Sequence, residues 1–230
     1  MNNLPADITP PLRQPPTEQD VDRALAEAGL PRFSTPVRER LALYLSLLMK
    51  WNKAMNLVGA RDWRQALLSL GADSFFLDNF LDSLSLPQNP EIWDLGAGAG
   101  LPGIPLCIIR QRKGAYRMIE ARAKRALFIG NALAQLKLTD VFVHEARVES
   151  FFQNPPGAPK AQVIISRAFK PWREVLELVR PHLAPQGVAI IMSNDHAEKN
   201  AHDGWKSAGY LPYELPAGKR MFQAFRADEL

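Results

Sequence analysis

A glycine-rich run and two acids between residues 94 and 120 could together bind a nucleotide-like cofactor. The run from Asp94 to Gly103 reads Asp-Leu-Gly-Ala-Gly-Ala-Gly-Leu-Pro-Gly. A glycine-rich turn from a strand into a helix lets a ligand approach the backbone closely, because no Cβ intervenes, and it points helix N-terminal amides at that ligand. Glu120 ends a second strand-like segment, where a carboxylate can accept hydrogen bonds from both hydroxyls of a ribose. Loop and acid therefore predict a nucleoside-containing cofactor.

Two cofactor classes fit this loop. Residues 98–103 have the dinucleotide spacing GxGxxG, whereas Asp94 followed by Gly96, Gly98 and Gly100 has the spacing of an S-adenosylmethionine turn. Asp94 favours S-adenosylmethionine, because a carboxylate would face the pyrophosphate of NAD unfavourably but can lie near a cationic sulfonium and ammonium. Without any cofactor, the same turn could simply let a helix pack closely on a sheet.

The elements around this loop predict a doubly wound α/β fold. Expected strands at 91–95, 116–120, 141–144, 162–166 and 188–192 alternate with expected helices near 102–110, 123–136 and 171–182. Alternation of this kind is typical of a parallel sheet covered by helices. Two further short strands, 210–215 and 220–225, predict an antiparallel hairpin at the sheet edge, with 216–218 as its turn. That hairpin favours a Rossmann-like class I methyltransferase over a nicotinamide dehydrogenase, which usually continues with parallel strands.

The first 85 residues have a different pattern. Residues 1–16 hold five prolines and predict a disordered leader. Thr17 opens a capping-box helix that ends at Gly29, and a longer helix follows from Ser34, with apolar residues at three- and four-residue steps. Further helices are expected at 62–70 and 74–84. We therefore expect an N-terminal helical region over 17–85 and a cofactor domain over 86–230.

Composition limits the class of protein. The chain has 230 residues, an apolar content of 47% and a net charge of +4, which permits nucleic-acid binding without requiring it. Cys107 is the only cysteine, so no internal disulfide can form, as is usual in a reducing compartment. Neither a signal peptide nor an apolar run long enough for a membrane span is visible. The sequence predicts a soluble, cytoplasmic protein that does not engage membranes.

The ends of the later expected strands carry further candidate ligands. Ligands of an open parallel sheet bind at the carboxyl ends of its strands. Val148 and Glu149 follow the third strand, the usual place for contacts to an adenine, although Arg147 and Glu149 could equally form a solvated ion pair. Arg167 ends the fourth strand. It could organise the cofactor pocket, contact nucleic acid, or form a salt bridge to Glu149 or Asp94.

Basic residues gather where the helix after Glu120 begins. Arg122, Lys124 and Arg125 could hold RNA phosphates, or they could only solvate a helix surface. No Cys/His cluster has the spacing of metal ligands, and no nucleophile elbow or paired carboxylate stands out, so we expect neither a metal nor a catalytic acid–base pair.

Several segments, taken in order, resemble the bacterial small-subunit ribosomal RNA guanine-N7 methyltransferase family, also called the glucose-inhibited-division protein B family. The loop and its continuation, residues 94–105, match the cofactor loop of that family almost residue for residue. Similar segments occur at 51–57, 80–84, 123–128, 147–149 and 165–169, so the likeness spans roughly 37–192. The chain departs from the family pattern at Asn79, where a histidine is usual, and at Ser193-Asn194, where Lys-Gly is usual.

The resemblance implies a class I S-adenosylmethionine-dependent methyltransferase that acts on N7 of a guanine in 16S rRNA, free or in an assembling small subunit. The sequence does not fix the oligomeric state, and we expect a monomer. It implies cofactor contacts at Gly96, Leu101, Val148, Glu149 and Arg167. Because N7 of guanine carries a free lone pair, no general base is needed, and alignment of the reactants can supply the catalysis. Methylation of another RNA or a small molecule, and a non-catalytic RNA-binding or assembly role, stay open as alternatives.

Overall fold

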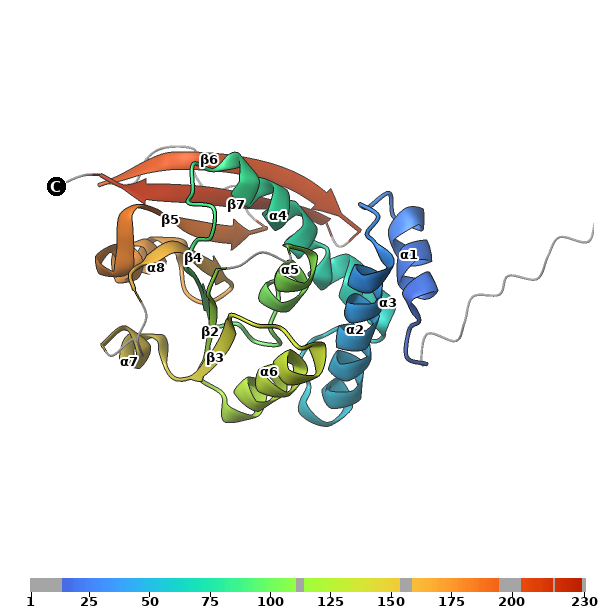
Figure 1. The fold of residues 1–230 in the computed structure, drawn as a ribbon. Helices are drawn as coiled ribbons and strands as arrows, with labels where there is room; N and C mark the ends of the chain where they lie inside the picture. The colour runs from blue at the N-terminus through green and yellow to red at the C-terminus, as the bar shows by residue number, and fades with distance from the viewer. Residues whose placement is uncertain (1–13, 111–113, 154–158, 195–203, 217, 229–230) are drawn as a thin grey trace, which may run out of the picture.

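A seven-stranded sheet forms the centre of the protein (Figure 1). The computed structural model describes residues 14–110, 114–153, 159–194, 204–216 and 218–228. The strand order is β3-β2-β1-β4-β5-β7-β6, and the strands are β1 (Ile92–Leu95), β2 (Tyr116–Glu120), β3 (Val141–Glu145), β4 (Ala161–Arg167), β5 (Leu183–Ser193), β6 (Trp205–Leu215) and β7 (Gly218–Ala227). The first five are parallel, and β7 and β6 pair antiparallel at the edge. This confirms the expected doubly wound sheet and its terminal hairpin.

Helices cover both faces of the sheet, as Figure 1 shows. On one face lie α2 (Thr35–Met55), α4 (Asp73–Ser83), α5 (Gly103–Arg110) and α6 (Ala123–Leu136). On the other lie α7 (Val148–Gln153) and α8 (Trp172–Val179). Alternate residues of the strands face opposite layers: Ile92 and Met118 join the first core, Trp93 and Ile119 the second. Parallel strands buried on both faces are nearly continuous runs of apolar residues, and β1 is buried throughout, with Asp94 as its one charged residue.

The N-terminal region is helical, as expected. Helix α1 (Glu18–Glu27) begins at a capping box, in which the Asp20 amide donates to Thr17 Oγ1 (3.2 Å) and the Thr17 amide donates to Asp20 Oδ2 (2.9 Å). Helix α3 (Trp63–Ala66) continues into a π-helical turn, Leu67–Gly71, before α4. Residues 1–13 of the expected leader lie outside the described residues, whereas Pro16 is buried.

The helical region shares one apolar core with the rest of the chain. Leu41 and Leu48 of α2 belong to the same buried cluster as Leu106 of α5 and Phe128 of α6. The Trp51 ring lies 5.7 Å from the Phe128 ring, measured between centroids. The boundary expected near residue 85 therefore falls within a continuous core.

The structure differs from the expected elements in several places. Strands β5 and β6 each begin five residues earlier than expected, at Leu183 and Trp205. The helix expected over 171–182 ends at Val179 and continues as a 3₁₀ turn, Arg180–His182; Pro181 lacks the amide that an α-helix would use there. Helix α7 was not expected, since its six residues are too few to show a helical period. It places Phe151 and Phe152 against Trp93, with ring centroids 5.0 and 5.7 Å from it.

Candidate functional site

The glycine-rich loop connects β1 to α5 and folds back over the end of β2. The amides of Gly96 and Ala97 both donate to the Ile119 carbonyl, at 2.9 and 3.1 Å. Gly96, Gly98 and Gly100 have φ values of 71°, 62° and 72°, a backbone conformation that side chains with a Cβ rarely adopt. The alternation of glycines thus sets the path of the loop at the carboxyl end of β1.

Two of these glycines are required by packing. A Cβ at Gly100 would overlap Ile104 Cδ1, and a Cβ at Gly103 would lie 2.7 Å from the Tyr116 ring. At Gly98 the nearest atom would be 3.8 Å away, an ordinary van der Waals contact, so packing does not require a glycine there. Leu101 is buried, and only its backbone can reach a ligand in the loop.

Glu120 is buried at the end of β2 and holds the loop. Its Oε2 accepts the Gly98 amide at 2.9 Å, and its Oε1 accepts the Arg122 amide at 2.8 Å. A carboxylate offers about four lone pairs on two oxygens, so each oxygen keeps room for one more donor. The carboxylate is therefore fixed in position and still able to bind two hydroxyl groups.

A cavity of about 660 Å³ lies at the carboxyl ends of β1 to β4, and we call it the cofactor cavity. It brings together four of the predicted ligands, Gly96, Glu120, Val148 and Glu149, with Arg122 and Arg125 at the start of α6. The remaining lining residues are Ile119, Ala121, Ala146, Arg147, Ala168, Phe169 and Lys170. A buried carboxylate, a glycine turn and an apolar wall suit a nucleoside-containing cofactor.

Glu149 has a different ion-pair partner from the expected Arg147. Its Oε1 lies 2.8 Å from Nζ of Lys170, which follows β4. The hydrogen bond from Lys170 lowers the pKa of Glu149. Both side chains are partly exposed, so this pair borders the mouth of the cofactor cavity and leaves Val148 as the buried wall beneath it.

The expected salt bridge from Arg167 to Glu149 or Asp94 does not form. Nη1 of Arg167 lies 2.9 Å from Oδ2 of Asp73, and neither Glu149 nor Asp94 pairs with it. Asp73 is the first residue of α4, and its side chain is fully buried. Burial raises the pKa of Asp73, while Arg167 and Arg220 oppose that shift. In the sequence, Asp73 has the appearance of an ordinary acidic helix start, so its partnership across 94 residues was not foreseeable.

Asp94 lies beneath the loop. It is 1% exposed and accepts a hydrogen bond from the Tyr116 hydroxyl at 3.1 Å. Burial raises its pKa to about 7, although the Tyr116 hydrogen bond opposes the shift. The expectation that Asp94 faces a cationic ligand directly finds no support in the lining of the cofactor cavity.

Two hydroxyl groups of the N-terminal helical region donate hydrogen bonds to the glycine-rich loop, and neither was predicted from the sequence. Tyr44 of α2 donates to the Ala99 carbonyl at 2.8 Å, and Ser74 of α4 donates to the Pro102 carbonyl, also at 2.8 Å. Tyr44 sits in an apolar helix stripe, where its ring alone accounts for its place. No spacing in the sequence could have shown where its hydroxyl points.

The basic residues of α6 lie beside the cofactor cavity. Arg122 and Lys124 are exposed and Arg125 is half-buried. Within the described part of the chain, no acidic side chain pairs with any of the three. They leave cationic groups available at the rim of the cavity.

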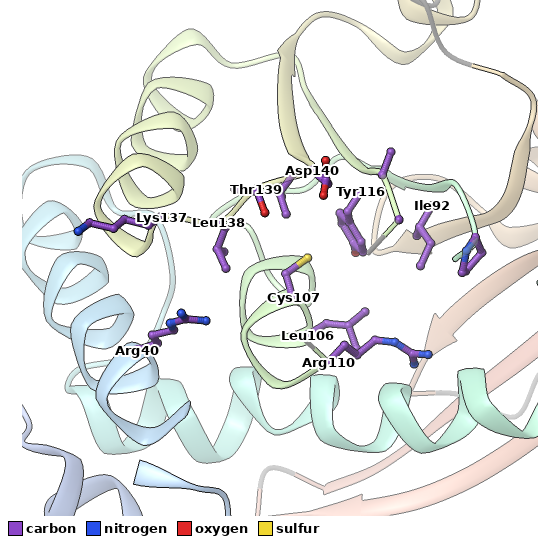
Figure 2. A pocket seen from close by; sticks show the side chains of 14 residues that line it. Arg40, Ile92, Leu106, Cys107, Arg110, Tyr116, Lys137, Leu138, Thr139 and Asp140 are labelled. Atoms are coloured by element: carbon purple, nitrogen blue, oxygen red, sulfur yellow. The ribbon is translucent and has the colours of Figure 1, made fainter. Parts of the chain in front are cut away.

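A second cavity, of about 350 Å³, lies at the opposite, amino-terminal edge of the sheet (Figure 2). Figure 2 shows Cys107 of α5 between Arg40 and Lys137 on one side and Tyr116 and Ile92 on the other. Burial raises the pKa of the Cys107 thiol, which makes it a poor nucleophile. Strands begin here, whereas ligands of such sheets bind where strands end.

In the ranges that the structure describes, no three His, Cys, Asp or Glu side chains converge so as to hold a metal ion. None of the helices in those ranges is both long and apolar enough to cross a membrane.

Comparison with known proteins now decides the family. The family model described as GidB, rRNA small subunit methyltransferase G, matches residues 37–214. The chain belongs to this family. A curated relative named ribosomal RNA small subunit methyltransferase G, from Nitratidesulfovibrio vulgaris (strain DP4), is 44% identical over 210 residues, which cover 91% of this chain and 94% of the relative. One of the same name from Lawsonia intracellularis is 44% identical over 188 residues, covering 82% and 86%. The family resemblance seen in the sequence is confirmed, and the protein is a methyltransferase.

Solved structures agree on the fold. An O-methyltransferase from Bacillus cereus in complex with SAH matches with a TM-score of 0.60 at 17% identity, over 90% of this chain and 97% of that one. The putative methylase HI0767 from Haemophilus influenzae matches with a TM-score of 0.51 at 17% identity, over 68% and 89%. The fold is that of class I methyltransferases, with helices added before it.

Proposed function

We propose that the protein transfers the methyl group of S-adenosylmethionine to N7 of a guanine in 16S rRNA. The observation that carries this is the family match over residues 37–214, which includes a loop and buried acid built for a nucleoside-containing cofactor. S-adenosylmethionine supplies an activated methyl group, and the chain supplies its position.

Each predicted ligand has a part in this proposal. Gly96 lines the cofactor cavity, whereas Gly98, Gly100 and Leu101 belong to the same loop but lie outside that lining. We expect the loop backbone to face the methionine portion and the ribose, and Glu120 to accept the ribose hydroxyls. Val148 provides an apolar surface for the adenine, and Glu149 borders it. Arg167 lies outside the lining of this cavity and, with its neighbour Ala168, marks the side from which the acceptor base arrives.

Positioning is sufficient for this reaction. N7 of guanine has a lone pair in the neutral base, so no residue must remove a proton before the transfer. Holding N7 in line with the methyl group and sulfur converts an encounter between two molecules into a step within one complex, an effect worth up to about 7–11 kcal/mol of the barrier.

Arg122, Lys124 and Arg125 would bind RNA phosphates beside the cofactor. They have exposed or half-exposed cationic groups at the start of α6, and Arg122 and Arg125 line the cofactor cavity. We expect each phosphate contact to add about 0.7–0.9 to the log–log slope of affinity against salt. Alanine at Lys124 and Arg125 together should flatten that slope by more than about one unit, with unchanged cofactor affinity. A double variant with the parent slope would show that these residues only solvate the helix.

Two measurements test the proposed reaction. Calorimetry should show binding of S-adenosylmethionine and not of NAD. Mapping of modified guanines in 16S rRNA from cells with and without the gene should show one 7-methylguanine that depends on it, and methylation of free rRNA against small subunits in vitro would identify the acceptor. If the protein binds the cofactor but rRNA from both strains carries the same modified guanines, methylation of another substrate or a non-catalytic assembly role would remain.

The departures from the family pattern lie outside the cofactor cavity. Asn79 is exposed on α4, and Ser193 and Asn194 lie beside Arg167, so these departures do not alter that cavity.

A further inference from the structure

A second hollow adjoins the cofactor cavity at the carboxyl ends of β4 and β5. It has a volume of about 320 Å³ and shares Ala168 with the cofactor cavity. We call it the Asp73 hollow, after the acid that organises it. Arg167, Ser193 and Asn194 line it from the strand ends, and Tyr213 and Arg220 line it from the hairpin.

A compact set of charges forms its wall. Oδ2 of the buried Asp73 lies 2.9 Å from Nη1 of Arg167 and 2.7 Å from Nη1 of Arg220, and Oδ1 accepts the Tyr213 hydroxyl at 2.8 Å. One carboxylate thus fixes two guanidinium groups, which leaves one net positive charge. Its oxygens already serve three donors, whereas a guanidinium has five N–H groups.

The donors of this set are held still and face the hollow. The Tyr213 ring is stacked on Phe76 at 4.6 Å and lies 4.7 Å from Phe222, between centroids. The side chains of Arg167 and Arg220 are 25% and 16% exposed, while Asp73 is 0% exposed. The hollow therefore offers preorganised hydrogen-bond donors, and three of the about four lone pairs of Asp73 are already used.

We infer that the Asp73 hollow receives the target guanine and that Arg220 donates a hydrogen bond to its O6. This rests on the proposed function, because it concerns the acceptor of that methyl transfer. Arginine is the side chain that most often recognises the O6 and N7 edge of guanine. Here N7 must stay free to accept the methyl group, so the donor contact is made at O6 alone. Adenine has an amino group at this position, which cannot accept from a guanidinium.

The surroundings of the hollow suit an RNA strand. On the hairpin side it continues into a further hollow of about 350 Å³, which shares Asn194, Tyr213 and Arg220 and adds Lys219. The target base can enter from that side while N7 reaches the methyl group across Ala168. The residues after β5 differ from the family pattern at this place, and Ser193 and Asn194 form part of the wall.

The first test compares two arginines on β7. Arg220→Ala should lower kcat/KM for methylation of small subunits or 16S rRNA from cells lacking the gene by about ten- to a hundredfold, the range for a lost hydrogen bond to a charged donor. Arg226→Ala is the matched control, since Arg226 lies on the same strand and donates to the Gln186 carbonyl, away from the hollow. Arg220→Met keeps the aliphatic stem and removes the donors, and serves if the alanine variant unfolds. All variants should keep the parent affinity for S-adenosylmethionine.

The second test probes the O6 contact. GMP, AMP and 2-aminopurine riboside 5′-monophosphate, which keeps N7 and lacks O6, are titrated by NMR into protein loaded with S-adenosylhomocysteine. The parent and Arg226→Ala should prefer GMP over the other two, and Arg220→Met should bind all three alike. A GMP preference retained by Arg220→Met, or methylation unchanged in it, would overturn the assignment while the proposed function stands. Absence of any guanine methylation by the parent protein would instead overturn the proposed function.

Discussion

The cofactor cavity and the Asp73 hollow lie side by side, and they are built in opposite ways. The cofactor cavity is formed by backbone turns and by residues next to each strand end, with Glu120 bonded to amides two and 22 residues away. The Asp73 hollow depends on side chains that meet across 94, 140 and 147 residues. The first is local and geometric, the second long-range and electrostatic. Substitutions should therefore act on the first through ligand affinity and on the second through both stability and substrate choice.

The largest effect is expected in the loop. Gly98→Val should reduce S-adenosylmethionine affinity below detection, because a branched side chain would occupy the place proposed for the cofactor and the φ of 62° disfavours any Cβ. The fold should persist, at a strain of about 1–2 kcal/mol. Calorimetry and thermal unfolding measure the two effects. Gly59→Val is the control, since a Cβ there meets nothing within 4 Å, and equal affinities in both variants would remove the loop from the cofactor site.

Substitution of Asp73, which joins Arg167, Arg220 and Tyr213 in the Asp73 hollow, should mainly lower the stability of the fold. Asp73→Ala leaves two guanidinium groups without their shared anion, and we expect the free energy of unfolding to fall by about 3–5 kcal/mol. Glu27→Ala removes the partner of Arg64 on the surface, where such pairs contribute about 0–1 kcal/mol. Urea denaturation of both variants makes the comparison. Similar small losses would show that the Asp73 set does not hold α4 and the hairpin together.

The buried acid beneath the loop, Asp94, predicts a pH dependence. Burial raises the pKa of Asp94 from its ordinary value of 3.8 to about 7 in the folded state, so the folded state binds the proton more tightly than the unfolded chain. The contribution of this proton is complete below about pH 4 and is lost as the pH rises to 7 and above. Asp94→Asn should therefore gain stability relative to the parent as pH rises, by up to roughly 4 kcal/mol at pH 8. Denaturation at pH 5 and pH 8 tests this, and a pH-independent difference would contradict it.

The smallest effect is expected for Glu120, and it distinguishes a residue that binds the ribose of the cofactor from one that binds RNA. Glu120→Gln should weaken S-adenosylmethionine binding by about 1–3 kcal/mol, the range for a lost charged hydrogen bond, because an amide group would also oppose one of the two backbone amides. RNA affinity without cofactor should stay at the parent value. Glu145→Gln is the control at the exposed end of the neighbouring strand β3. A change confined to RNA affinity would show that Glu120 does not bind the ribose.

The same contrast explains what could be predicted from the sequence. The strands, the loop and the hairpin follow from local periodicity and glycine placement, and helix 123–136 is found with both of its expected ends. The candidate ligands Gly96, Glu120, Val148 and Glu149 meet because strand ends of a parallel sheet share one edge. The partner of Arg167 was missed because an ion pair across the fold leaves no period or motif. Tyr44 and Ser74 were missed for the same reason, since their hydroxyls act on carbonyls that any residue could provide.

The hydrogen bonds from Tyr44 and Ser74 to the loop have a consequence for dissection of the protein. A fragment beginning near residue 86 would keep every element of the Rossmann-like sheet and lose both hydroxyls that hold Ala99 and Pro102. It would also uncover the apolar surfaces of α5 and α6 that α2 covers. Truncation would thus yield a fragment that aggregates and whose glycine-rich loop is no longer held in place, and not a minimal enzyme. The helices before the sheet are a structural part of the binding site, and the smallest working unit includes them.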